Sequence, residues 1–316
     1  MMQIFTNTKY DFISKRHWAY AISLIVTLAG LGHIAWQGGL KYGIDFSGGT
    51  LIQVRFQQPT TVDAVRSALD RVRMGESVIQ EFGDAQEYLI RIPASTGALE
   101  ETSKRVEQAV KEAGLPGFEV RRLEFVGPQV GRDLQLQAVY AVLAGMVGIL
   151  IYTALRFDFR GGVAAIIALI HDVLVALAAL SIANREMSLP VLAALLTIVG
   201  FSINDTIVVF DRIRETRGRG LRKGETLADV INAAINQTLS RTILTSLTVF
   251  LVVFILFIWG GEVLRDFAFA LLVGVVTGTY SSVFVAAPII VDWENWSQSR
   301  QRKGAKKAVV KAAAGR

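Results

Sequence analysis

The residue best suited to chemistry in this chain is Asp205, which lies inside the apolar run 191–210. A carboxylate at membrane depth costs roughly 2.5–3.5 kcal/mol on insertion scales, so few chains carry one unless a proton or an ion uses it. Apolar surroundings disfavour the charged form of an acid, whereas a nearby cation favours it. Arg241, at the start of the following apolar run, is the expected cation. A carboxylate between these influences can bind and release a proton; the alternative is a salt bridge that only holds two helices together.

Four more polar residues lie at membrane depth and are candidate accessory groups: His171, Asp172, Ser202 and Asn204. Adjacent helix positions point about 100° apart, so His171 and Asp172 are not expected to share one partner face, and one of them could face Asp205. Ser202 lies one turn before Asp205 and is expected to hydrogen-bond it. Proton relay and simple hydrogen bonding between helices are both compatible with this set.

Six apolar runs provide the elements that must position these residues. The chain is 52% hydrophobic and only 19% charged, which is more apolar than one water-soluble core of 316 residues needs. A helix needs about 20 residues to cross a hydrocarbon core, so the runs predict six transmembrane helices rather than a barrel. The runs are 18–36, 138–155, 163–182, 189–210, 243–259 and 267–291.

The distribution of basic residues predicts the orientation of these spans. Basic residues gather before the first run, in the connections 156–160 and 212–223, and in the tail after the last run. The two short connections of opposite parity carry one basic residue each, Arg185 and Arg265. By the positive-inside rule both termini are cytoplasmic, and the first run is an uncleaved span. The predicted parts are residues 1–37 (N-terminus and first helix), 38–133 (outer domain), 134–291 (helices two to six) and 292–316 (tail).

The outer segment 38–133 has the pattern of a small α+β domain. Turn residues separate strands at 50–56, 77–82, 88–92 and 119–125 from amphipathic helices at 61–73 and 99–113. This βαββαβ order predicts a ferredoxin-like fold built from split βαβ units. Such a fold supports many unrelated functions, so it does not identify one by itself.

Glycine-rich motifs flank this domain on both sides. The segment from Gly43 through Asp45 to Gly48 and Gly49 lacks the Gly-Lys-Ser/Thr ending of a phosphate-binding loop and opens a strand rather than a helix. We therefore interpret its glycines as a hinge where the chain leaves the membrane. We interpret Gly127, Pro128 and Gly131 as the matching hinge where the chain enters the membrane again.

Three further segments have weaker signals. The stretch 226–238 is amphipathic and is expected at the membrane surface or against the helix bundle. Gly274 and Gly278 offer a small-residue face for close packing, expected against a partner subunit. The tail 292–316 ends in a basic, alanine-rich segment that is expected to be disordered and to contact anionic lipid.

Six motifs occur in order along the chain, at 42–50, 126–131, 171–173, 201–206, 211–215 and 240–242. Together they resemble the SecF family, which forms the smaller half of the SecDF protein-translocation accessory complex in the resistance-nodulation-division superfamily. In that family the residues matching Asp205 and Arg241 are assigned to proton transport. Phe201 stands where the family is expected to have tyrosine, so a hydroxyl relay through that position is not expected.

The resemblance implies a function and a set of partners. The chain would be half of a transporter in the bacterial inner membrane, completed by SecD and associated with the SecYEG channel. It would use the proton-motive force to promote preprotein translocation after the ATP-driven SecA step, with protons as coupling ion, no other cofactor and no nucleic acid. Half of a proton-driven lipid or small-molecule exporter and a passive membrane scaffold are the alternatives. No nucleophile triad, metal cluster or nucleotide motif indicates an enzyme.

Overall fold

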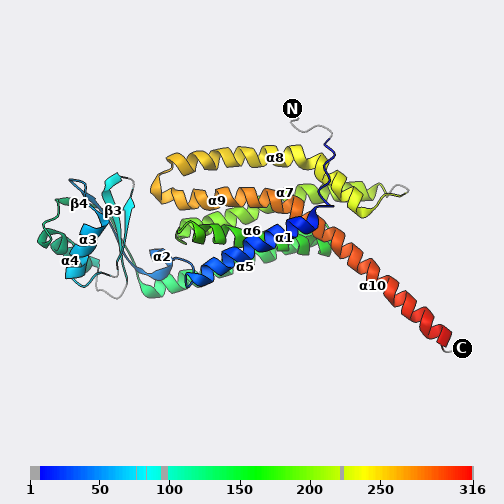
Figure 1. The fold of residues 1–316 in the computed structure, drawn as a ribbon, viewed down its shortest axis with the longest axis horizontal. Helices are drawn as coiled ribbons and strands as arrows, with labels where there is room; N and C mark the ends of the chain where they lie inside the picture. The colour runs from blue at the N-terminus through cyan, green and yellow to red at the C-terminus, as the bar shows by residue number, and fades with distance from the viewer. Residues whose placement is uncertain (1–7, 76, 83, 94–98, 221–223, 315–316) are drawn as a thin grey trace.

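The computed structural model describes residues 8–75, 77–82, 84–93, 99–220 and 224–314, and consists of a long helix bundle with a small sheet domain at one end (Figure 1). Among the described residues, six helices are long and apolar enough to cross a membrane, as the six apolar runs predict. They extend beyond the predicted runs at several ends. Their bounds are α1 Arg16–Trp36, α5 Pro128–Arg156, α6 Phe159–Ile182, α7 Leu189–Gly218, α8 Leu227–Trp259, and a last span formed by α9 Gly261–Ser281, the π-helical turn η2 Ser282–Ala286 and α10 Ala287–Ala314.

Helix α8 joins two segments that the sequence pattern separates. Thr226 and Asp229 form a capping box at its N-terminus, so the helix starts well before the apolar run. Ile231 and Ile235 on its first turns are buried in the bundle core. On the same segment the side-chain oxygen of Asn232 accepts a hydrogen bond of 2.9 Å from the backbone N–H of Phe12. The amphipathic stretch 226–238 therefore packs against the bundle, one of the two placements expected for it.

The sheet domain has the predicted element order, β1 Gly49–Phe56, α3 Val62–Arg71, β2 Val78–Phe82, β3 Asp84–Ile92, α4 Leu99–Glu112 and β4 Phe118–Val126. The strands pair antiparallel in the order β2-β3-β1-β4, so that β3 lies between β1 and β2 as in a split βαβ unit. Helices α3 and α4 cover one face, where Val54, Phe56 and Tyr88 are almost completely buried. The opposite face of the sheet looks toward the ends of the membrane helices near Asn184 and Asp266.

Close helix packing in the bundle depends on glycines. A Cβ atom on Gly274 of α9 would lie 2.2 Å from Cγ1 of Ile198 on α7, and one on Gly278 would lie 3.0 Å from Cβ of Ser202. The small-residue face of α9 therefore packs against α7 of the same chain, and the expectation that it packs against a partner subunit is wrong. The reason is that two glycines one turn apart let α9 approach its own neighbour closely.

Replacing Gly274 with Val is expected to destabilise the bundle by about 1–3 kcal/mol, the usual cost of overpacking a core. The measurement is the thermal unfolding midpoint of the purified chain in detergent. Gly148→Val on α5 is the control, because a Cβ atom at Gly148 would have no heavy atom within 4 Å. Equal midpoint shifts in the two variants would contradict the packing argument.

The C-terminal segment differs from the disordered tail that its composition predicts. Helix α10 continues without a break to Ala314 and leaves the bundle at the end away from the sheet domain (Figure 1). Its residues include many strong helix formers, and the last span already supplies the costly helix nucleus, so extension of the helix is favourable. The guanidinium of Arg300 lies 4.0 Å from the ring centroid of Trp296 near the point where α10 departs.

Candidate functional site

Asp205 lies at the meeting point of three helices inside the bundle. Its side chain is 1% exposed, and its Oδ2 accepts a hydrogen bond of 3.2 Å from Oγ of Ser246 on α8. Ser246 in turn lies 2.7 Å from Oγ1 of Thr279 on α9. Within the described part of the chain, Ser246 provides the side-chain hydrogen bond found at Asp205. This carboxylate is therefore buried but only lightly held.

Asp172 is the second buried carboxylate, and its surroundings differ. Its Oδ2 accepts hydrogen bonds from Oγ of Ser202 on α7, at 2.6 Å, and from Oγ of Ser281 on α9, at 2.7 Å. Nδ1 of His171 lies 3.0 Å from its Oδ1. Asp172 is fully buried and connects α6, α7 and α9.

These contacts correct one expectation. Ser202 hydrogen-bonds Asp172 rather than Asp205, because the facing helix α6 brings a carboxylate closer to its hydroxyl than the next turn of α7 does. His171 and Asp172 also contact each other, since the imidazole turns toward the neighbouring carboxylate. Neither residue has a hydrogen bond or ion pair to Asp205 among the described residues.

The two carboxylate clusters are stacked along the bundle. Asp172 precedes the end of α6 at Ile182 by about 15 Å, and Asp205 follows the start of α7 at Leu189 by about 24 Å, at 1.5 Å per helical residue. Asp205 is therefore farther from the sheet domain. The clusters are linked through one turn of α7, from Ser202 to Asp205, and through neighbouring positions of α9.

Arg241 and Asn204 lie at the surface of the bundle. Both side chains are exposed, and Arg241 makes no ion pair with Asp205 or with another carboxylate in the part of the chain that the structure describes. Arg241 is nevertheless close enough to interact electrostatically with Asp205. Arg241 lies on α8, the helix that also provides Ser246, but the described residues show no salt bridge between Arg241 and Asp205, and its role as the cation stays a prediction.

The sequence pattern did not predict the hydroxyl partner of Asp205, which is Ser246. Thr242 and Ser246 are one helical turn apart on the buried face of α8, and both point into the bundle. The Oγ1 atom of Thr242 is buried and has no hydrogen-bond partner among the described residues. A four-residue spacing of hydroxyls beginning at Thr238 is the signal that could have found them. No group of three or more His, Asp or Glu side chains in the described residues is arranged to hold a metal ion.

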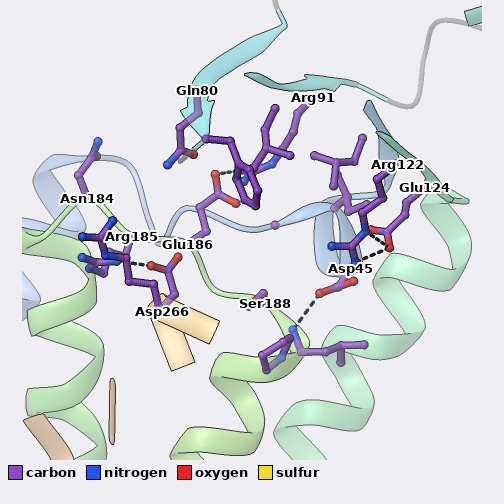
Figure 2. A pocket seen from close by; sticks show the side chains of 18 of the residues that line it. Asp45, Gln80, Arg91, Arg122, Glu124, Asn184, Arg185, Glu186, Ser188 and Asp266 are labelled. Carbon is purple, nitrogen blue, oxygen red and sulfur yellow. Dashed lines mark hydrogen bonds and ion pairs between the residues drawn. The ribbon is translucent and has the colours of Figure 1, made fainter. Parts of the chain in front are cut away.

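The first glycine motif forms a joint between the sheet domain and α7. The backbone N–H of Gly43 donates to the carbonyl of Met187 at 2.8 Å, and the N–H of Met187 donates to the carbonyl of Lys41 at 2.7 Å. Oδ2 of Asp45 accepts a hydrogen bond of 2.9 Å from the backbone N–H of Leu189, the first residue of α7 (Figure 2). A carboxylate at this position satisfies a free N–H group and the positive end of the helix dipole.

Three glycines of the joint have a specific structural requirement. Gly48 and Gly49 have φ angles of +70° and +131°, which side chains rarely adopt. A Cβ atom on Gly131 of α5 would lie 2.8 Å from the carbonyl oxygen of Phe46, in a short helix α2 (Ile44–Ser47) that the sequence pattern missed. The other members of the two motifs have no such requirement. A Cβ atom on Gly43 would have its nearest heavy atom at 3.4 Å, and one on Gly127 would have none within 4 Å. Pro128 is the first residue of α5.

Three ion pairs, Arg91–Glu186, Arg185–Asp266 and Arg122–Glu124, line a cavity of about 590 Å³ between the uncovered sheet face and the helix ends nearest the sheet domain (Figure 2). Arg91 of β3 pairs with Glu186, in the loop between α6 and α7, and both side chains are about four-fifths buried. Arg185 pairs with Asp266 of α9. Burial lowers the pKa of Arg91, whereas the negative charges of Asp266 and Asp45 raise it; arginine stays cationic in proteins. The loop that connects the two carboxylate-bearing helices is thus fastened to the sheet domain.

Replacing Glu186 with Gln is expected to weaken this attachment by about 1.5–3 kcal/mol, because it removes a charge-assisted hydrogen bond from the shielded Arg91. Hydrogen exchange at the Gly43 amide should accelerate, since that amide bonds the adjacent Met187 carbonyl. Glu124→Gln is the matched control: it removes a carboxylate from an exposed pair, in which Oε1 lies 2.5 Å from Nη2 of Arg122. Unchanged exchange at Gly43 in the Glu186 variant would rule out this fastening role.

The fold and the site define a multi-pass membrane protein with buried carboxylates inside its helix bundle and a sheet domain inserted after the first span. Family models agree with this class and make it specific. "Protein export membrane protein SecD/SecF, C-terminal" matches residues 105–296, and "SecD/SecF GG Motif" matches residues 36–60. The chain belongs to the SecF family of protein translocase subunits.

Individual relatives support this assignment. The chain is 48% identical over 295 residues to protein translocase subunit SecF of Magnetococcus marinus, covering 92% of this chain and 94% of the relative. It is 46% identical to the SecF subunit of Desulfurispirillum indicum, with coverages of 89% and 91%. The crystal structure of SecDF, a translocon-associated membrane protein from Thermus thermophilus, matches with a TM-score of 0.83 at 38% identity over 93% of this chain. The present chain spans 40% of that longer chain.

Proposed function

We propose that this chain uses the proton-motive force to promote preprotein translocation through SecYEG after the ATP-driven SecA step, and that Asp205 is the group that binds and releases the proton. The observation that carries the proposal is the contrast between the two buried carboxylates. Asp172 is held by three polar side chains, whereas Asp205 has a single hydroxyl partner within the described residues. A lightly held carboxylate can change protonation state without breaking a network.

The driving force is large enough for mechanical work. A proton that crosses the membrane field supplies about 2.3 kcal/mol per 100 mV. A difference of this size shifts an equilibrium between two arrangements of similar energy by more than tenfold. The route on the side away from the sheet domain would follow the hydroxyls of Thr242 and Ser246, because Thr242 is a buried polar group with no partner among the described residues.

Helix α7 provides the connection from the proton site to the outer domain. It carries Asp205 in the bundle, and Asp45 of the glycine motif caps its first residue. The ion pair between Arg91 and Glu186 fastens the preceding loop to the sheet. A change in the position of α7 on protonation would therefore act directly on the sheet domain. We propose that this domain is a ferredoxin-like periplasmic module that contacts the polypeptide.

SecD is the expected partner, and the exposed polar side chains at membrane depth indicate the surface that it would cover. Asn204 and Arg241 are exposed on the bundle surface, and polar side chains at membrane depth are costly unless other groups cover them. The similar SecDF chain contains additional residues beyond the part that this chain matches. Both termini would be cytoplasmic in the bacterial inner membrane, since basic residues gather at the bundle end away from the sheet.

The test is export of a secreted protein into inverted membrane vesicles that contain the chain, SecD, SecYEG and SecA. With the proton gradient intact, the chain is expected to raise the yield of translocated protein; collapse of the gradient with an ionophore should remove the increase and leave the SecA-driven yield. A stimulation that persists without the gradient would reject proton coupling and favour a scaffold.

A further inference from the structure

A hollow of about 320 Å³ opens at the end of the bundle opposite the sheet domain. It lies between the end of α5, the start of α6, the last turns of α7 and the beginning of α10. Its volume is at the lower end of the range of small-molecule sites. We call it the α7 hollow; its principal lining residues are Phe157, Phe210, Ile213, Arg214, Arg217 and Ile290.

The hollow combines an apolar floor with a cationic rim. Phe210 and Ile213 are buried core residues of the bundle, and their neighbours on the floor are also aromatic or aliphatic. The rim carries Arg214 and Arg217, which are exposed. An amphiphile with an anionic head and an apolar body matches this distribution of groups.

The arginines of this region outnumber the carboxylates available to them. Arg156 and Arg214 both pair with Asp211, at 3.0 and 3.2 Å, and Nη1 of Arg214 also donates to the carbonyl of Arg156 at 3.0 Å. Asp158 also lines the hollow, but its Oδ1 accepts a hydrogen bond of 2.6 Å from the backbone N–H of Gly161 and so caps α6. Arg217 has no ion pair in the part of the chain that the structure describes.

The neighbouring contacts hold the rim in place. The guanidinium groups of Arg156 and Arg214 lie 5.3 and 5.7 Å from the ring centroid of Phe157. Cation–π contacts of this kind hold the ring of Phe157 and the two guanidinium groups in place relative to one another. Arg214 is therefore positioned before any ligand arrives, and Arg217, one turn nearer the end of α7, extends the rim.

We propose that the α7 hollow is a binding site for an anionic phospholipid, with the phosphate held by Arg214 and Arg217 and the first acyl segment against Phe210 and Ile213. A guanidinium matches the oxygens of a phosphate with two parallel hydrogen bonds, and basic pockets between membrane helices suit anionic headgroups. A zwitterionic lipid would bind less well, because its ammonium group opposes the surplus of arginines. This inference does not depend on proton coupling.

The test uses the full chain with its SecD partner, purified in detergent, and counts lipid adducts by native mass spectrometry during titration with phosphatidylglycerol or phosphatidylcholine. Phosphatidylglycerol should bind more tightly. Arg217→Gln should weaken it about fivefold, the effect of one surface cation on binding to anionic lipid. Arg219→Gln is the matched control, because it removes the same charge two residues later from a side chain that pairs with Glu215 instead of lining the hollow.

A second variant tests the apolar part. Gly218 lines the hollow, and a Cβ atom there would have no heavy atom within 4 Å, so Gly218→Leu adds apolar bulk at the edge of the hollow without a clash. It should reduce phosphatidylglycerol binding, whereas inorganic phosphate should not compete. Equal binding of the two lipids, equal losses in Arg217→Gln and Arg219→Gln, or full binding to Gly218→Leu would each overturn the proposal.

Discussion

Asp205→Asn is expected to abolish the gradient-dependent part of export while the chain still folds and assembles. Asn has almost the same size as Asp, and its amide oxygen can still accept the hydrogen bond from Ser246, so the bundle loses little. The amide cannot bind or release a proton near neutral pH, so the coupling step is lost entirely. The expected yield in the vesicle assay is the yield of the natural chain after collapse of the gradient.

The control for this variant is Asp211→Asn on the same helix, which makes the same chemical change. Asp211 is an exposed carboxylate, whereas Asp205 is buried, so a loss confined to the buried position separates proton binding from general damage to α7. The amount of assembled chain is measured by co-purification with SecD. If Asp205→Asn kept full gradient-dependent stimulation at equal assembly, the carboxylate would be structural, and the scaffold function would be favoured for this subunit.

The six spans and the order of elements in the sheet domain could be predicted from the sequence because they depend on local patterns. Run length decides whether a helix can cross a membrane, and alternating turn signals separate the strands. Burial of Asp205 could be predicted in the same way, from the apolar residues around it. Such signals act over one element at a time.

Partners across helices could not be predicted from those patterns. Spacing along α7 suggests that Ser202 meets Asp205, but the contact with Asp172 depends on how α6 and α7 face each other. The cap of α7 by Asp45 joins residues 144 positions apart, and no local pattern near Leu189 indicates it. Sequence predicts which side chains are buried more readily than it predicts which of them touch.

Asp172→Ala is expected to destabilise the bundle severely, in contrast to the Asp205 variant. The change removes the acceptor for Ser202, Ser281 and His171 at a fully buried position between three helices. Hydrogen bonds between membrane helices contribute about 0.6 kcal/mol on average and up to about 1.7, so the loss of three amounts to roughly 2–5 kcal/mol before the cavity is counted. That is a large share of the usual stability of a protein.

The measurements that separate the two carboxylates are the thermal unfolding midpoint and the amount of chain recovered with SecD. Asp172→Ala should lower both, and Asp211→Ala, which removes an exposed carboxylate of α7, should change neither strongly. Export should then fall in proportion to the assembled chain. If Asp172→Ala assembled normally and melted at the natural midpoint but lost gradient-dependent export, Asp172 would itself carry protons, and the contrast with Asp205 would no longer identify the coupling residue.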